Sequence, residues 1–255
     1  MDWILYLVIF LYGIVFGSFL NVCIYRIPKE ESLIKVGSHC MSCGYHLKWY
    51  DLIPLFSWLF LRGRCRKCGA KISVQYPLIE GANGVLWVIV FLVHGFCVES
   101  IFYCALVSAL LALSVIDART YIIPFGFNIF IFCLGVLHLG YRIIWTDKPD
   151  IWLYVIGFFA VSTVTAAIYF FSKGRAIGGG DVKLMAAAGL LLGWKLIVLS
   201  FVLGCILGAV IHSVRMKVSK ADHVLAMGPY LSAGIFLSLI CGEPFLDWYF
   251  RILGW

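Results

Sequence analysis

The sequence contains few charged residues. Asp, Glu, Lys and Arg make up 13% of its 255 residues, and hydrophobic residues make up 63%. Soluble domains have about 25% charged and about 45–50% apolar residues. This composition excludes an ordinary soluble domain and predicts a membrane protein.

Several signatures of well-known enzyme classes are also missing. The chain has no HExxH zinc-protease motif, and Gly178-Gly179-Gly180 neither follows a strand nor forms a G-x-G-x-x-G phosphate-binding loop. No Ser, His and Asp occur together in a context typical of a serine hydrolase. The remaining candidates for chemistry are charged residues at membrane depth, which are costly and therefore usually functional.

Long uncharged runs are abundant instead. A hydrocarbon core of about 30 Å needs about 20 helical residues. Seven uncharged runs have 17 residues or more: Trp3–Tyr25, Gly81–Val98, Ser100–Ile116, Thr120–Tyr141, Ile151–Ser172, Leu196–Val214 and His223–Gly242. An eighth, Ala176–Trp194, qualifies if Asp181 and Lys183 are tolerated within it. We therefore predict an all-α polytopic membrane protein with about eight transmembrane helices.

The first run is predicted to be a retained span. The acidic residue Asp2 directly precedes it, and it lacks both the basic segment and the small-residue cleavage site of a signal peptide.

Positive charges predict the orientation. Eight Lys and Arg residues lie in 27–75, and others lie at Arg119, Lys173, Arg175 and 215–220. Threading eight spans places all of them on one side, which the positive-inside rule makes cytoplasmic, with both termini on the opposite side. The net charge of +7 then needs only this topology and anionic lipid headgroups, so we expect no nucleic-acid partner.

The segment 27–75 contains a metal-binding pattern. Cys40 and Cys43 form one C-x2-C pair, and Cys65 and Cys68 form a second pair 21 residues later. Four thiolates can surround Zn²⁺ tetrahedrally at about 2.3 Å, and such closed sites are usually structural. A segment this short is too small for a core of its own. Because cytoplasmic thiols stay reduced, we predict structural zinc here rather than disulfides.

Other candidate ligands are not expected to bind this metal. His39 and His46 flank the first pair, but four cysteines already complete a tetrahedron. The remaining cysteines lie in apolar spans and are predicted to be small buried hydrophobic residues: Cys23, Cys97, Cys104, Cys133, Cys205 and Cys241.

Two carboxylates stand out at membrane depth. Asp117 ends the third run, and Asp181 lies about 8 Å into the eighth if that segment is helical. Both are predicted near the cytoplasmic surface. Two converging carboxyl groups cannot both ionise in a poorly solvated site, so one keeps its proton while the other acts as a base on a shared water. This is the chemistry of an aspartic protease, and Gly178 and Gly180, which lack Cβ, would let a substrate or helix approach closely.

Simpler interpretations of both aspartates stay open at this stage. Asp181 could be the N-cap of the following helix. Asp117 could be an ordinary charge at the end of a span, beside Arg119.

The roles of four further polar residues are also open. Lys183 could hold Asp181 in its charged form or extend to the surface and lipid phosphate. Glu80 could attract a basic leader or a free amine, or cap its helix. Asn21 and Arg26 are candidates for hydrogen bonds between the loop and the helices.

Several segments, together with the cysteine loop, resemble a known family. They occur in the order and spacing of the bacterial type IV prepilin peptidases, the prepilin leader peptidase and N-methyltransferase family of GxGD-type intramembrane aspartic proteases. The similarity extends over nearly the whole chain. The segments are GSFLNVCIYRIP, QYPLIEGANG, IDARTYIIP, GGGDVKLMAAAGLLLG and MGPYLSAG.

The resemblance implies an activity and assigns residues. Asp117 and Asp181 would be the catalytic pair, and Gly178 and Gly180 the motif glycines. Such enzymes cut prepilins and pseudopilins after a glycine at the cytoplasmic face of the inner membrane. They then methylate the new N-terminal amine with S-adenosylmethionine. Phe125 stands where the family usually has Asn or Asp, and Met227 replaces an aromatic residue, so substrate preference is not transferred.

These expectations combine into one organisation. Residues 1–26 form the first span, 27–75 the zinc loop and 76–255 the peptidase core, with the loop and active site facing the cytoplasm. The sequence does not locate a methyl-donor pocket or name the pilus or type II secretion system that supplies the substrate. Two alternatives stay open: a peptidase without methyl transfer, and a zinc-bearing transporter or assembly scaffold, whose carboxylates would lie nearer the membrane midplane.

Overall fold

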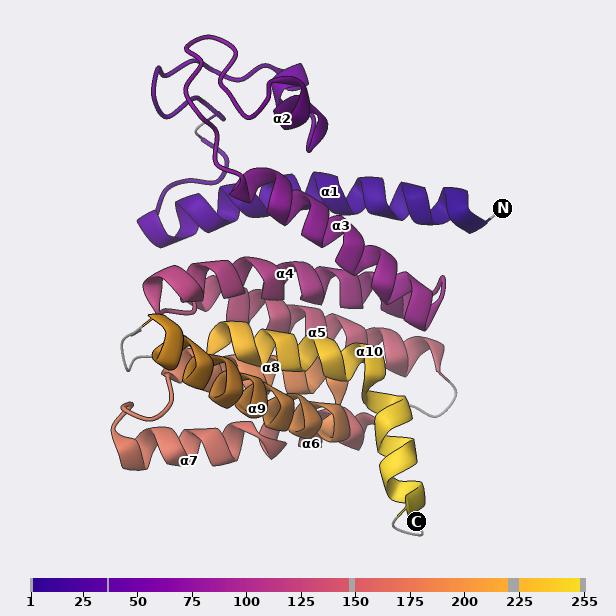
Figure 1. The fold of residues 1–255 in the computed structure, drawn as a ribbon. Coiled ribbons are helices and arrows are strands. Elements are labelled where there is room, and N and C mark those ends of the chain that lie inside the picture. Colours follow the sequence, from indigo (N-terminus) through magenta and orange to yellow (C-terminus); the bar gives the residue numbers. More distant parts are fainter. Residues whose placement is uncertain (1, 36, 147–149, 220–224, 253–255) are drawn as a thin grey trace. The chain divides into compact units, whose positions relative to one another are not determined.

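A computed structural model describes residues 2–35, 37–146, 150–219 and 225–252. All regular elements within these ranges are helical, which confirms the predicted fold class. Contacts divide the chain into two compact units, Met1–Ala112 and Leu113–Trp255 (Figure 1). The α-helices are α1 (Asp2–Arg26), α2 (Phe56–Phe60), α3 (Gln75–His94), α4 (Val98–Thr120), α5 (Phe125–Trp145), α6 (Ile151–Ala160), α7 (Ser162–Ser172), α8 (Gly179–Leu192), α9 (Trp194–Ser219) and α10 (Gly228–Ile252).

Seven segments of the described chain are long and apolar enough to cross a membrane. They are Trp3–Lys29, Gln75–His94, Val98–Thr120, Phe125–Trp145, Ile151–Ser172, Trp194–Lys217 and Gly228–Ile252. The eighth predicted span is the shorter helix α8, whose 14 residues extend about 21 Å. It begins after extended Gly178 and ends at Gly193, which has a left-handed φ of 80°. The predicted count of eight was therefore approximate.

Helices α1 and α3 pack closely in the first unit. A Cβ added to Gly13 would lie 2.7 Å from the Cα of Gly84, so only small residues allow this approach. The Asn83 amide donates to the Gly13 carbonyl at 2.7 Å and accepts from the Ser108 hydroxyl of α4 at 2.8 Å. This buried polar chain links α1, α3 and the first part of α4.

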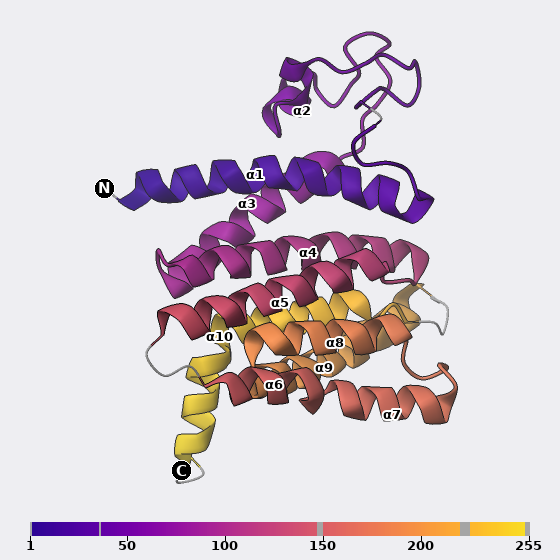
Figure 2. The same cartoon turned by 180° about the vertical axis from the view of Figure 1, so that it is seen from behind.

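Helix α8 is the central helix of the second unit. It packs against α5, α6, α7, α9 and α10, and Figures 1 and 2 show it among these neighbours. Most of its residues from Leu184 to Leu192 are buried. Because protein surrounds it, α8 does not need the length of a lipid-facing span.

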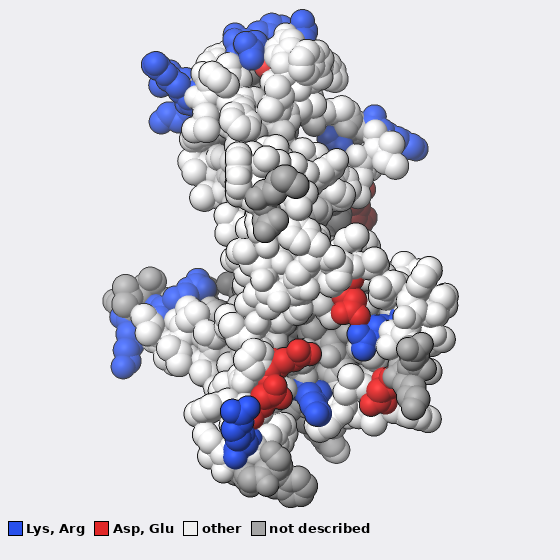
Figure 3. Space-filling view, turned by 90° about the vertical axis from the view of Figure 1, so that its right-hand side faces the viewer, with Lys and Arg blue, Asp and Glu red and all other residues white. Residues whose placement is uncertain are grey.

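The surface of both units is largely apolar. Most of the surface seen in Figure 3 belongs to uncharged residues, and large side chains such as Trp3, Phe130 and Phe171 are exposed. Such a surface is suited to lipid.

The prediction that the scattered cysteines are buried is wrong for three of them. Cys97, Cys133 and Cys241 are exposed. Cys133 and Cys241 lie in helices, and an uncharged run alone does not reveal which face of a helix a cysteine occupies. Cys97 lies in the turn between α3 and α4.

Candidate active site and metal centre

Asp181 lies in the first turn of α8. Gly178 is the N-cap of this helix, and the Asp181 Oδ2 reaches back to accept the Gly178 N–H at 3.2 Å. Asp181 is therefore not the N-cap itself, but its carboxylate satisfies an amide that the helix leaves without a partner. A Cβ added to Gly178 would lie 2.9 Å from the same oxygen. This position thus favours glycine.

Asp117 lies in the last turn of α4 and is fixed by the start of α10. Its Oδ2 accepts the Gly228 N–H at 2.9 Å, across 111 residues of sequence. Asp117 does lie at the end of its helix, but it is only 4% exposed, so it is not a charge solvated by water. Tertiary contacts hold this carboxyl group in one place.

The two carboxyl groups both belong to the second unit and lie near enough for their charges to interact. Asp181 is only 8% exposed. The end of α4 and the starts of α8 and α10 lie at the same end of this unit in Figures 1 and 2. The structure therefore brings together the two aspartates that the sequence singled out.

Gly180 allows the start of α5 to approach α8. A Cβ added there would lie 3.0 Å from the Ile123 Cβ, and the Gly180 carbonyl accepts the Asn128 amide at 3.4 Å. Both motif glycines thus have a steric reason. Gly178 leaves room for the carboxylate, and Gly180 leaves room for a neighbouring segment.

The Lys183 side chain contacts Phe125, not Asp181. Its ammonium lies 4.7 Å from the centre of the Phe125 ring, a cation–π contact. Within the described ranges it forms no ion pair with Asp181.

The four predicted metal ligands converge. The sulfur atoms of Cys40, Cys43, Cys65 and Cys68 all lie within 4.8 Å of one another. The Cys40 and Cys68 sulfurs are 3.8 Å apart. A tetrahedral site with Zn–S bonds of about 2.3 Å requires sulfur separations of about 3.8 Å, so the donor set fits zinc.

Each pair of cysteines lies in a small turn of its own, and the two turns have the same hydrogen-bond pattern. In the first turn, the Gly44 N–H donates to the Cys40 carbonyl at 2.9 Å. In the second, the Gly69 N–H donates to the Cys65 carbonyl at 2.9 Å. Both glycines have left-handed φ angles, 67° and 71°, which side chains disfavour.

Backbone amides also act on the first ligand. Hydrogen bonds from Ser42 and Cys43 lower the pKa of the Cys40 thiol to about 6. This favours the thiolate, the form that binds metal.

The chain is also similar in sequence to proteins of one known family. Residues 11–94 match the bacterial peptidase A24 N-terminal domain, and residues 104–213 match the type IV leader peptidase family. A prepilin leader peptidase/N-methyltransferase of Xanthomonas campestris pv. campestris is 30% identical, covering 95% of this chain and 93% of the relative. The chain belongs to the type IV leader peptidase family.

Other relatives carry the same name. A prepilin leader peptidase/N-methyltransferase of Pseudomonas putida is 29% identical, covering 95% of this chain and 92% of the relative. One of Myxococcus xanthus is 34% identical, covering 80% and 61%. No solved structure gives a significant match.

Charged and amide side chains join the cysteine loop of this family member to helices of its first unit. The Glu80 carboxylate of α3 accepts the Leu55 N–H at 2.7 Å, so it bonds to the loop instead of capping its helix. Arg26 of α1 donates to the Ser32 and Leu33 carbonyls, each at 3.2 Å. The candidate role of Arg26 in tethering the loop is thereby confirmed.

Asn21 and Asp51 make contacts within the helices and within the loop, respectively. Asn21 donates to the Tyr76 carbonyl at the start of α3 at 3.1 Å. Asp51, whose side chain is 2% exposed, pairs with Arg66 at 2.7 Å, which links the two halves of the loop.

Sequence reasoning missed Gly228 and Asn128 at the active site. Gly228 occurs in the MGPYLSAG segment, but its role requires knowledge of what lies next to it in space. Asn128 is a buried amide within an apolar span, a feature that by itself marks a candidate site.

Gly228→Ala is expected to reduce cleavage by about 100-fold. The new Cβ would lie 2.7 Å from the Asp117 Oδ2 and displace it, and a shift of about 1 Å in a catalytic group can have this effect. Initial rates of leader removal measure it. Gly140→Ala in α5 is the matched control, because its Cβ would meet no atom within 4 Å; equal rates for both variants would contradict the role of Gly228.

Proposed function

We propose that this chain is a membrane aspartic endopeptidase that removes the basic leader from type IV prepilins or pseudopilins after a glycine. The observation that carries the proposal is the buried Asp117 and Asp181 pair, in which each carboxylate is fixed by a backbone amide. The names of the relatives indicate the substrate class.

The proposed reaction uses the two carboxyl groups in opposite states. The ionised one removes a proton from a water molecule, whose oxygen bonds to the scissile carbonyl carbon. The protonated one donates its proton as charge develops on the substrate. The first carboxyl group then gives the proton it took from water to the leaving nitrogen, and the second takes a proton back from the tetrahedral intermediate. As the C–N bond breaks, the leader is released with a new carboxyl terminus, and the pilin with a new amine. Each carboxylate uses Oδ2 for its amide bond, which leaves Oδ1 to contact the water.

We also propose that the protein lies in the inner membrane with its active site and cysteine loop facing the cytoplasm. The eight positive charges in 27–75 support this orientation, as do Arg119 and Arg175. A prepilin leader is basic and precedes a long apolar helix, so its scissile bond lies at the membrane edge, where this orientation places the aspartates.

The cysteine cluster is proposed to hold one structural Zn²⁺. Closure by four thiolates leaves no open position for substrate. In this proposal 27–75 is a zinc-stabilised loop, and 76–255 is the peptidase core, to which residues 1–26 add the first span.

The second proposed activity is N-methylation with S-adenosylmethionine, which the names of the relatives include. The free amine of the cut pilin forms a bond to the donor's methyl carbon as the S–C bond breaks. The electron pair of that bond stays on sulfur, giving S-adenosylhomocysteine, and the amine releases a proton to water. A charged, water-soluble donor does not readily enter lipid, so this step belongs at the loop or its junction with the helices.

Separating the two activities tests the proposal. Asp181→Asn is expected to stop cleavage and yet methylate a pre-cut peptide with a free N-terminal Phe, because methyl transfer does not use this carboxylate. The assay is transfer of labelled methyl groups to that peptide. A wild-type enzyme that cuts prepilin but never labels the product would leave only the peptidase. Loss of labelling in Asp181→Asn would show that the two sites are not separable.

A further inference from the structure

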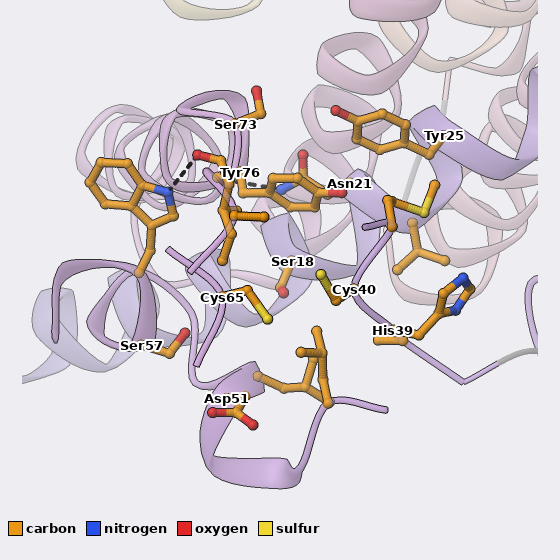
Figure 4. Close-up of a pocket in the computed structure, with 18 of the residues that line it drawn as sticks. Ser18, Asn21, Tyr25, His39, Cys40, Asp51, Ser57, Cys65, Ser73 and Tyr76 are labelled. Carbon is orange, nitrogen blue, oxygen red and sulfur yellow. Dashed lines mark hydrogen bonds between the residues drawn. The ribbon is translucent and has the colours of Figure 1, made fainter. Parts of the chain in front are cut away.

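A cavity of about 350 Å³ lies within the first unit, where the cysteine loop meets α1 and α3. This volume is within the range of small-molecule sites, about 300–1,000 Å³. In Figure 4, Tyr25 and Tyr76 lie at one end, Asp51 at the other, and Cys40 and Cys65 between them. The proposed peptidase reaction uses none of these residues.

One wall of the cavity is aromatic. Tyr25 and Tyr76 stack with ring centroids 5.5 Å apart and an interplanar angle of 14°. Each belongs to a helix, and Asn21, which bonds to the Tyr76 carbonyl, fixes the two helices beside each other. The flat face of a nucleobase can stack on such an aromatic pair, and this stacking does not depend on which base it is.

The cavity also contains a buried negative charge. Glu80 is 6% exposed and forms no ion pair with Lys or Arg among the residues that the structure describes. A buried carboxylate of this kind favours a cationic or hydroxyl-bearing ligand. Asp51 and the exposed Glu31 add two further acids to the lining, although Arg66 neutralises Asp51.

Positive charge is located in the more exposed part of the lining. Lys29 and Lys71 line the cavity and are exposed, and the half-buried Arg26 lies beside them in the lining. These groups suit a ligand carboxylate. The lining therefore combines an aromatic platform, a buried acid and surface cations.

We propose that this cavity binds the methyl donor S-adenosylmethionine. The adenine stacks on Tyr25 or Tyr76, Glu80 contacts the hydroxyl or cationic groups, and the cations of the lining bind the amino-acid carboxylate. This inference rests on the proposed methylation. It also predicts that loss of zinc weakens donor binding, because the proposed zinc ligands Cys40 and Cys65 form part of the wall.

Binding of S-adenosylhomocysteine to the zinc-loaded, full-length protein in detergent tests the proposal by isothermal titration calorimetry. Tyr76→Ala is expected to raise its Kd about tenfold, since it removes a stacking surface. Glu80→Gln removes the charge but keeps an oxygen for the Leu55 N–H, and it is expected to weaken S-adenosylmethionine binding by a similar factor. Trp49→Ala is the control, because Trp49 is 78% exposed on the same loop and does not line the cavity.

The possible outcomes distinguish failure of the cavity assignment from failure of the proposed methylation. If wild type methylates and binds but both variants bind with unchanged Kd, the cavity is not the donor site and methylation stands. If donor binding is unchanged while the KM for the pre-cut peptide rises, the cavity takes the acceptor amine and the proposal is overturned. If wild type binds neither compound, methylation and the cavity assignment both fail while cleavage stands.

A second measurement uses only wild-type protein, so it tests the proposal even if the variants lose zinc or do not fold. Ultraviolet cross-linking of labelled S-adenosylmethionine to wild-type protein, followed by peptide mapping, is expected to label residues between Ser18 and Glu80. Labelling confined to other parts of the chain would overturn the assignment.

Discussion

Replacement of Asp117 or Asp181 with Asn is expected to reduce leader cleavage by a factor of about 10³ or more. General acid–base groups contribute about 10² to 10⁴ in rate, and each of these two carboxyl groups has a different task in one reaction. The measurement is the initial rate of prepilin cleavage by purified protein. Asp247→Asn, an exposed carboxylate on α10, is the matched control and should cleave at the wild-type rate.

Loss of activity in these variants will not reflect loss of the fold. Asn retains an oxygen that can accept the Gly228 or Gly178 N–H, so the bond between α4 and α10 and the bond at the start of α8 both remain. Yield and thermal unfolding should therefore match wild type. Substantial cleavage by either well-folded variant would rule out the aspartate pair as the catalytic group.

Replacement of Cys43 or Cys68 with Ser is expected to release about one Zn²⁺ per chain. Metal binding supplies folding free energy that a short loop cannot obtain from a core, so 27–75 should become sensitive to protease. Metal content by mass spectrometry and limited proteolysis measure the two effects. Cys241→Ser, an exposed cysteine outside the cluster, is the control and should keep the zinc and the protected loop.

The same cysteine variants should lose more methylation than cleavage. The loop lines the proposed donor cavity, whereas both aspartates belong to the second unit. Labelled methyl transfer to a pre-cut peptide is compared with cleavage of intact prepilin. Unchanged metal content in both Ser variants would contradict the zinc site, and an equal loss of both activities would contradict the separate roles of loop and core.

The composition and the cysteine spacing were sufficient to predict the helical membrane fold and the four-cysteine cluster. Seven of the predicted runs correspond to candidate spans. They are visible in the sequence because a helix that crosses lipid must be apolar along most of its length. The two C-x2-C pairs predicted a cluster because each pair closes its own turn, marked by Gly44 and Gly69. Local geometry was decisive in both cases.

The length of α8 and the role of Glu80 could not be predicted in this way. A hydropathy pattern does not distinguish a helix surrounded by protein from one that faces lipid, and α8 is surrounded by other helices. Glu80 seemed placed to cap a helix, but its carboxylate bonds to Leu55, 25 residues earlier in the chain. Contacts of this range depend on how the segments pack.

The sequence by itself determined that this chain forms membrane helices, carries a four-cysteine site and places two aspartates at the ends of apolar segments. These properties depend on residue type and spacing along a single element. Only the tertiary structure decided that Asp117 is fixed by Gly228, that it interacts with Asp181, and that a cavity forms beneath the cysteine loop. The physical reason is that each of these features is made by segments far apart in the chain, so it exists only when the helices are packed.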